Sequence, residues 1–303
     1  MDNTQKATVI DVTHYLLPFS ILMFGVMVSA GIFFGFRSAF GVSTKEEVVL
    51  NCDSVSPLSE DCLRQYARDL DTNEKKFDKC ILEGEQAEAI DNEVAAGEEA
   101  NVLGTPSLFI GKGKGDEFQG FYIGSVMTQE DMVDVIEYAK DHSIEETHDY
   151  WYGYQLQLLA DFEGQVREFY ASDQGGNLTG EEFDTEVERV ISQRGDLIDE
   201  AFVLQDLSIG DGIVDGKGDV VLMAFSDFEC PYCAQLEEES LNGIKEQYVD
   251  SNEIRFVFRD FPLDEIHPNA RLAAQAARCF DKAGGDYFEY HDLLFEKTYN
   301  LGQ

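Results

Sequence analysis

The chain has 303 residues, of which 44% are hydrophobic and 27% are charged, a globular composition with room for one or two domains. Acidic residues outnumber basic ones by 60 to 22, so the formal net charge is −38. Because phosphate backbones and anionic lipid headgroups are bound by clustered Lys and Arg, this charge argues against a nucleic-acid partner and against docking on anionic lipid. The hydrophobic fraction argues against global disorder, and a saline habitat would be one explanation for the acidity.

The first predicted element is an apolar stretch from Tyr15 to Phe36 that contains no charged residue. As a helix, these 22 residues would cross the hydrocarbon core of a bilayer, which is roughly 30 Å thick. A cleaved signal peptide is the alternative, although its apolar region usually has only about 7–15 residues. We therefore expect residues 1–14 to form an N-terminal tail and residues 15–36 a single transmembrane helix. The few flanking charges do not fix its orientation.

Three regions follow. Residues 46–140 begin with a short apolar run and an acidic helical region, continue through the sequence GTPSLFIG and a Gly-rich turn, and end in a helix expected at Asp131–Lys140. Residues 141–200 are expected to be helical. Residues 201–303 contain two apolar runs typical of strands, separated by a helix and followed by more helix to the end of the chain.

The strongest local signal is the sequence Cys230-Pro231-Tyr232-Cys233, which follows the apolar run Val220–Phe225 and precedes a charged helical stretch. A helix N-terminus carries a partial positive charge and free N–H donors, which stabilise a thiolate and lower the pKa of Cys230. Proline is tolerated just inside a helix, and Cys233, one turn further on, is expected to be buried and to resolve a mixed disulfide. The alternative, half of a zinc site, would need a second close pair of Cys or His residues, and the remaining ones are scattered.

The sequence FSDFECPYC resembles the active site of the DsbA-like thiol:disulfide oxidoreductases, membrane-anchored extracytoplasmic members of the thioredoxin superfamily. The resemblance continues through Ile254–Asp260 into HPNARLAAQAARCF, which is similar to the first helix of the helical subdomain inserted in that fold. It implies a redox-active disulfide without a cofactor or metal. The family usually has an acidic residue where this chain has Ala224, so Asp227 or Glu229 would have to substitute in relaying protons.

The later half of that fold lies upstream in this chain. Residues 59–84 resemble the later insertion helices, residues 99–124 resemble the loop and hairpin, and Thr105-Pro106 occupies the cis-proline position of the family. The resemblance therefore implies an α/β thioredoxin-like fold with an inserted helical subdomain, circularly permuted. Its C-terminal half would be residues 46–140, its N-terminal half residues 201–303, and residues 141–200 would be the linker. The alternative is a tandem of two truncated domains that complete each other between chains, as in a domain-swapped dimer.

The four other cysteines bear on this fold. The resemblance implies a structural bridge between Cys80 and Cys279 inside the helical insertion. Cys52 and Cys62 flank a short loop that a disulfide could close. The alternative is that Cys80 and Cys279 are reduced residues in separate cores.

Two further motifs lie in the linker region. The sequence ASDQGGNLTGEEF, residues 171–183, misses the Gly and Glu positions of a calcium loop, so we expect a capped turn instead, with Thr179 as N-cap and Glu182 completing a capping box. The aromatic cluster near the start of the region is expected to pack the linker helix onto the domain, with a docking surface as the alternative; its members are Tyr150, Trp151, Tyr152 and Tyr154.

The expected function is oxidation of substrate protein thiols at Cys230 and Cys233, on the extracytoplasmic side of the cell membrane. Pro231 and Tyr232 would tune the redox potential, and the Thr105-Pro106 loop would pair with an extended substrate peptide. Reoxidation would need a quinone-linked membrane partner. The alternatives are a disulfide reductase or isomerase of the same fold, and a membrane-tethered thioredoxin-like module that binds thiol-bearing partners without turnover.

Overall fold

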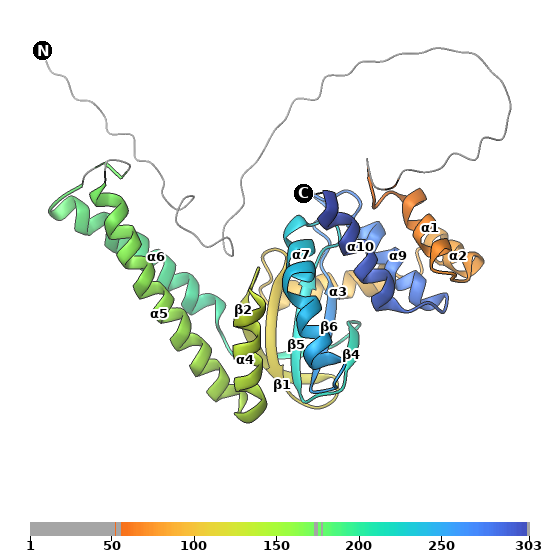
Figure 1. Cartoon of the computed structure of the whole chain (residues 1–303), viewed down its shortest axis with the longest axis horizontal. Coiled ribbons are helices and arrows are strands. Elements are labelled where there is room, and N and C mark those ends of the chain that lie inside the picture. Colours follow the sequence, from red (N-terminus) through yellow and green to blue (C-terminus); the bar gives the residue numbers. More distant parts are fainter. Residues whose placement is uncertain (1–51, 53–55, 173–174, 177, 302–303) are drawn as a thin grey trace, which may run out of the picture.

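The computed structural model in Figure 1 describes residue 52 and residues 56–172, 175–176 and 178–301. The predicted N-terminal tail and transmembrane helix, residues 1–14 and 15–36, lie outside the described residues. Among the residues that are described, no helix is both long enough and apolar enough to cross a membrane.

A six-stranded sheet forms the centre of the molecule, with the strand order β3-β2-β1-β5-β6-β4. Strands β5 and β6 are parallel, and every other neighbouring pair is antiparallel. The strand bounds are β1 Ser107–Lys112, β2 Glu117–Gly124, β3 Gln205–Ser208, β4 Ile213–Gly216, β5 Val220–Ser226 and β6 Ile254–Asp260. Because β1 pairs with β5 along its whole length, the regions upstream and downstream of the linker share one sheet.

Two of these strands, β3 and β4, differ from the sequence expectation of two strands in residues 201–303. Each has only four residues and lies at an edge of the sheet, where its side chains are mostly half-buried or exposed. Strands of this kind lack the continuous apolar run that identifies β5 and β6, whose residues are almost all buried.

Helices cover both faces of the sheet. One face packs against α4 (Gln129–Asp141) and the active-site helix, which begins as α7 (Pro231–Leu236). This helix continues to Val249, with π-helical stretches on either side of α8 (Asn242–Ile244). The other face packs against α3 (Ala87–Glu99).

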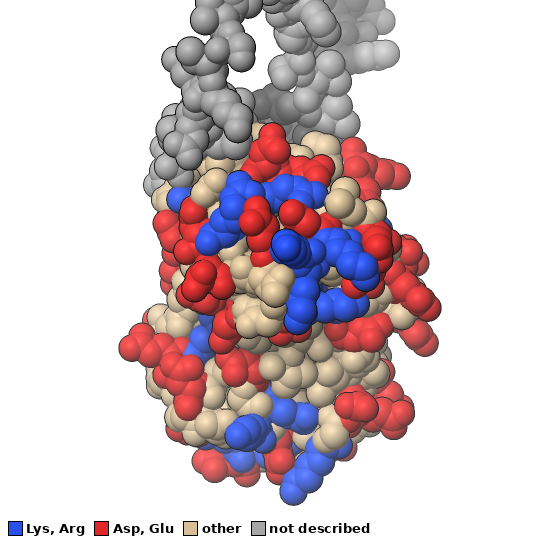
Figure 2. Space-filling view, turned by 90° about the vertical axis from the view of Figure 1, so that its right-hand side faces the viewer, with Lys and Arg blue, Asp and Glu red and all other residues tan. Residues whose placement is uncertain are grey.

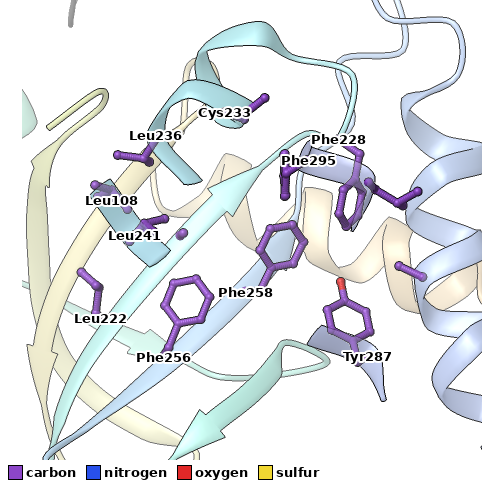
Figure 3. Packing of buried hydrophobic residues seen from close by; sticks show 14 of the residues in the cluster. Leu108, Leu222, Phe228, Cys233, Leu236, Leu241, Phe256, Phe258, Tyr287 and Phe295 are labelled. Atoms are coloured by element: carbon purple, nitrogen blue, oxygen red, sulfur yellow. The ribbon is translucent and has the colours of Figure 1, made fainter. Parts of the chain in front are cut away.

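The alternation of side chains along the central strands builds the two cores. Leu108, Leu222, Phe256 and Phe258 point to the face of the active-site helix, where Leu236 and Leu241 cover them (Figure 3). Their neighbours Phe109, Val221, Met223 and Val257 belong to the core under α3. This period of two is the pattern expected for strands buried on both faces.

A helical subdomain extends the sheet domain on the side opposite α4 (Figure 1). Its helices come from both ends of the described chain: α1 Glu60–Asp69, α2 Glu74–Glu83, α9 Ala270–Lys282 and α10 Tyr287–Leu301. The Tyr290 hydroxyl donates a hydrogen bond of 2.6 Å to the Leu63 carbonyl, which joins α10 to α1. Disulfides link Cys80 to Cys279 and Cys52 to Cys62, each with the Cα atoms 5.6 Å apart, so both pairings named from the sequence are present.

The outer surface of the helical subdomain is charged. Figure 2 shows this side of the molecule, where Lys and Arg side chains gather in the upper half among Asp and Glu. Ion pairs join the two signs, among them Lys79 and Lys282 with Glu85, at 3.0 and 2.8 Å. Hydrogen bonds from Lys282 and then Lys79 lower the pKa of Glu85 to about 2. Glu85 therefore matches two of the basic side chains on the described part of this surface.

The linker region forms an arm of two helices, α5 (Ile144–Ala171) and α6 (Glu181–Ala201), which projects away from the sheet (Figure 1). The two helices run antiparallel, because α5 contacts α6 both at Tyr152 with Asp199 and at Arg167 with Asp184. The arm has a small core of its own, centred on Val166, Tyr170, Val187 and Val190.

The aromatic cluster at the base of the arm packs it onto the sheet domain. Trp151 is buried, and its Nε1 donates a hydrogen bond of 3.0 Å to the Ile123 carbonyl in β2. The Tyr154 hydroxyl donates to Asp131 of α4 at 3.2 Å, and Tyr150 stacks on Tyr138 with the ring centroids 4.2 Å apart. These contacts agree with the prediction that the aromatic cluster packs the linker helix onto the sheet domain.

The prediction of a capping box between Thr179 and Glu182 is wrong. The N-cap of α6 is Gly180, whose φ of 67° is one that glycine adopts readily, so the helix begins one residue later and has no side-chain cap. A capping box does exist at the start of α5, between Ser143 and Glu146. Asp173, the first residue of the calcium-loop alternative, lies outside the described residues.

Candidate active site

Cys230 lies at the N-cap of α7, directly after the turn that leaves β5. Its backbone N–H donates to the Asp227 carbonyl at 3.1 Å, and its carbonyl accepts from Ala234 N at 3.1 Å, which closes the first turn of the helix. Pro231 takes the first helical position, where its missing N–H has no intrahelical partner to lose. The local sequence therefore fixes the Cys230 side chain at the positive end of the helix.

The two cysteines of the motif are free thiols whose pKa values are shifted in opposite directions. A hydrogen bond from Cys233 lowers the pKa of Cys230 to about 7, against the opposing effect of burial. Burial in turn raises the pKa of Cys233 well above its ordinary value. Cys233 is fully buried in the core under the active-site helix (Figure 3). Near neutral pH, Cys230 can thus supply a thiolate while Cys233 holds its proton.

The Thr105-Pro106 loop comes from the other region of the chain and lies against Cys230. The Thr105-Pro106 peptide bond is cis, and β1 begins immediately afterwards at Ser107. The Cys230 Sγ donates a hydrogen bond to the Thr105 carbonyl at 3.5 Å. A single site is therefore assembled from residues on both sides of the arm.

Asp227 and Glu229, the acids considered as proton relays, both bind the loop between β6 and α9. The Asp227 carboxylate accepts hydrogen bonds from Glu229 N and Leu263 N, at 2.7 and 2.8 Å, and lies 2.8 Å from His267 Nδ1. The Glu229 carboxylate accepts from the backbone N–H and the side-chain amide of Asn269. Both side chains fix the active-site turn to this loop, which is a positioning role the sequence did not suggest.

Ala224, the position at which the resemblance implied an acid, is buried in the sheet core. A charged group lies instead further along the active-site helix. There the Lys245 ammonium donates to Glu237 at 3.2 Å and to Asp292 at 2.7 Å. His291 completes a set of side chains that could offer ligand atoms to a metal ion, and the Lys245 cation pairs with both carboxylates of this set.

No local sequence pattern identified His267 or Lys245. His267 could have been found from topology, because parallel strands β5 and β6 end at the same edge of the sheet, so the segments after both strands must meet there. Lys245 has no such signal, since a lysine in an acidic helix reads as an exposed residue.

A comparison with protein-family models matches residues 209–302 to the family described as thioredoxin. The chain carries a thioredoxin-like domain. The matched segment includes strand β5, the CPYC motif and the helices α9 and α10. The Thr105-Pro106 loop, which contacts Cys230, lies outside the matched segment.

Curated relatives of the chain fall into two groups. Over 75 residues it is 41% identical to the Na(+)/H(+) antiporter NhaA 3 of Salinispora tropica, which is 25% of this chain and 11% of that protein. Over 84 residues it is 31% identical to the probable disulfide bond formation protein D of Bacillus cereus, which is 27% of this chain and 38% of that protein. The chain thus spans about a tenth of the first relatives and well under half of the second. No solved structure shows a significant match.

Proposed function

We propose that the protein is a thiol:disulfide oxidoreductase of DsbA-like type that oxidises substrate protein thiols at Cys230 and Cys233. The observation that carries the proposal is the contact between the Cys230 Sγ and the Thr105 carbonyl, which sets a nucleophilic thiol against the loop that precedes β1. The similarity to a disulfide bond formation protein over 84 residues supports the same reaction class.

The reaction would proceed in two exchange steps. A substrate thiolate attacks Cys230 Sγ of the oxidised site, the bond to Cys233 breaks, and Cys233 leaves and takes up a proton. A second substrate thiolate then attacks the substrate sulfur of the mixed disulfide, and Cys230 leaves as a thiolate. Two substrate thiols lose two electrons and two protons, and the site becomes the dithiol. The backbone of the Thr105-Pro106 loop would hold the substrate as an added strand.

The proposal includes a place in the cell and a source of oxidant. Residues 15–36 would anchor the chain in the membrane, with the catalytic domain on the extracytoplasmic side, where disulfides persist. The bridges at Cys52–Cys62 and Cys80–Cys279 support an oxidising compartment. A quinone-linked membrane partner would accept the two electrons and restore the Cys230–Cys233 disulfide.

We also propose that the thioredoxin fold is circularly permuted in this chain. Strand β1 and the cis-proline loop, which the DsbA-like order places late, precede β5 and the CPYC motif here, and both regions contribute to one sheet and one site. The arm α5–α6 would be the connection that the permutation requires. A domain-swapped dimer, in which each half pairs with the other chain, is the competing arrangement.

One observation favours the opposite redox direction. Reducing members such as thioredoxin have a nucleophilic cysteine with a pKa of about 7, whereas the strong oxidant DsbA has about 3.5. The pKa of Cys230 is about 7. A reductase or isomerase that shares this fold is therefore the second candidate, and a non-catalytic module that only binds thiols is disfavoured by the thiolate character of Cys230.

A paired assay on the full-length protein tests the function and its direction. The oxidised protein is incubated with excess oxidised glutathione and a reduced, unfolded protein whose activity returns when its disulfides form, and the reduced protein is incubated with excess dithiothreitol and insulin. The proposal predicts refolding at catalytic levels in the first assay, abolished by Cys230→Ser. Insulin reduction without refolding would favour the reductase, and no turnover in either assay would leave the binding module.

A further inference from the structure

The loop from Phe261 to Asn269 covers the turn that precedes the active-site cysteine. Its Phe261 N–H donates to the Ser226 carbonyl at the end of β5 at 2.8 Å. From there the loop is held by Asp227 at Leu263 and by Glu229 at Asn269. Three hydrogen-bonded attachments along its length therefore hold this loop in place beside Cys230.

His267 is the ionisable side chain that this loop brings to the site. Its Nδ1 lies 2.8 Å from Asp227 Oδ2, and its side chain is 16% exposed while that of Asp227 is fully buried. The backbone carbonyl of the same Asp227 accepts the N–H of Cys230. One buried aspartate thus binds both the imidazole of His267 and the backbone of the reactive cysteine.

We propose that His267, oriented by Asp227, is the positive charge that stabilises the Cys230 thiolate in this protein. Asp227 alone would oppose that thiolate, since its charge is one of the groups that disfavours ionisation of Cys230. An imidazolium bonded to Asp227 cancels this repulsion. The proposal rests on the proposed function for its role in catalysis, where the stabilised thiolate would be the leaving group of the second exchange step.

The electrostatics of His267 agree with this geometry. Burial disfavours its charged form, but the hydrogen bond and the charge of Asp227 outweigh burial and raise its pKa, with smaller contributions from Cys230 and Glu229. Coupling between two titrating groups is reciprocal, so a thiolate that favours the imidazolium is itself favoured by it. On the loop itself, Asp264 is engaged by Arg271 at 2.8 Å.

The test measures the ionisation of Cys230 directly, without a substrate protein. Full-length protein is mildly reduced so that the other two disulfides persist, and the alkylation rate of Cys230 is followed from pH 4 to pH 10 by peptide mass spectrometry. His267→Asn is the central variant, because the asparagine amide can keep the hydrogen bond to Asp227 without a titrating charge. His142→Asn, in a half-buried residue whose ring contacts Tyr138, is the matched control.

The wild-type profile should show two ionisations, one from Cys230 and one from the coupled His267. In His267→Asn the profile should reduce to a single step whose midpoint lies about one pH unit higher, the lower end of the range for a close opposite charge. His142→Asn should match the wild type, and His267→Lys, which keeps a positive charge, should restore a low midpoint.

An unchanged profile in His267→Asn would overturn the proposal, as would an equal shift in His142→Asn. Should His267→Asn fail to fold, a wild-type midpoint in folded His267→Gln would overturn it in the same way. The exchange assays separate this inference from the proposed function. A shifted thiol profile in a protein without turnover would refute the function and keep the assignment of His267, whereas turnover with an unshifted profile would do the reverse.

Discussion

Thr105 and Cys230 are 125 residues apart in the chain, yet the Cys230 Sγ donates a hydrogen bond to the Thr105 carbonyl at 3.5 Å. The contact depends on the pairing of β1 with β5, which brings Leu108 opposite Ala224 and Ser107 opposite Phe225. The end of β5 and the start of β1 consequently meet at one edge of the sheet. Any change that separates the two regions must therefore dismantle the site as well as the sheet.

The first prediction concerns whether residues 46–140 and 201–303 of the same chain pair with each other to form the sheet. Non-reducing peptide mapping should recover a peptide pair linked through Cys80 and Cys279, and sedimentation of the same sample should show a monomer. The structure places both cysteines in one chain with their Cα atoms 5.6 Å apart. The same linked pair found only in a covalent dimer would favour the swapped arrangement, and free thiols at both positions would favour two separate truncated domains.

The second prediction concerns the stability that this bridge supplies. It closes a segment of 199 residues, and the chain-entropy model gives about 5 kcal/mol for such a loop. The double variant Cys80→Ala/Cys279→Ala should lose up to that amount in urea unfolding under non-reducing conditions. Cys52→Ala/Cys62→Ala is the control, because its separation of 10 residues gives about 3 kcal/mol. A larger loss in the control would contradict the clamping role of the long-range bridge.

The third prediction follows from a buried group of charges that joins α3 to β6 and α9. Glu93 is fully buried and pairs with Arg259 at 2.5 Å, and Arg278 pairs with Asp260 beside it. Burial raises the pKa of Glu93 to about 7, although the charge of Arg259 opposes this. The folded state therefore holds this proton more tightly than the unfolded chain does. The stability from this group is fully present below about pH 4.5 and is lost as the pH rises through about 7.

Urea unfolding at pH 5 and pH 8 measures this effect. The shift of Glu93 corresponds to at most about 3 kcal/mol, and Glu93→Gln, which cannot ionise, should remove that part of the decline between the two pH values. Glu98→Gln, an exposed acid on the same helix, should leave the decline as in the wild type. Identical pH dependence in Glu93→Gln and the wild type would show that Glu93 is ionised throughout this range.

The parts of the fold that were predictable from the sequence depend on local chemistry. The strand before the CPYC motif is a continuous apolar run, and the helix after it begins where Pro231 allows. The Thr105-Pro106 loop and the Cys80–Cys279 pairing came from resemblance to a known fold, and the structure has both the cis bond and the bridge. Each of these features is encoded within a few residues or within a family motif.

The remaining features depend on contacts that no local pattern contains. The edge strands β3 and β4 form because β2 and β6 offer them unpaired edges. The start of α6 was misplaced because Gly180, with its positive φ, is the N-cap instead of Thr179. His267 acquires its role only when the loop after β6 folds onto the turn after β5. Such residues belong to elements that meet through the sheet, so their function becomes visible only in three dimensions.

The central claim is that Cys230 exchanges disulfides with substrate thiols in a site built from both regions of the chain. Trapping with Cys233→Ser tests it most directly, because this variant lacks the enzyme thiol that could attack the mixed disulfide, and a substrate with a single cysteine has no second thiol to release itself. Full-length Cys233→Ser, activated at Cys230 by a small disulfide, is mixed with a reduced substrate protein that has a single cysteine, and the trapped complexes are mapped by mass spectrometry. The account predicts that every trapped substrate is bonded to Cys230 and that Cys230→Ser traps nothing and has no oxidase activity. Full oxidase activity in Cys230→Ser, or trapping at another cysteine, would contradict it.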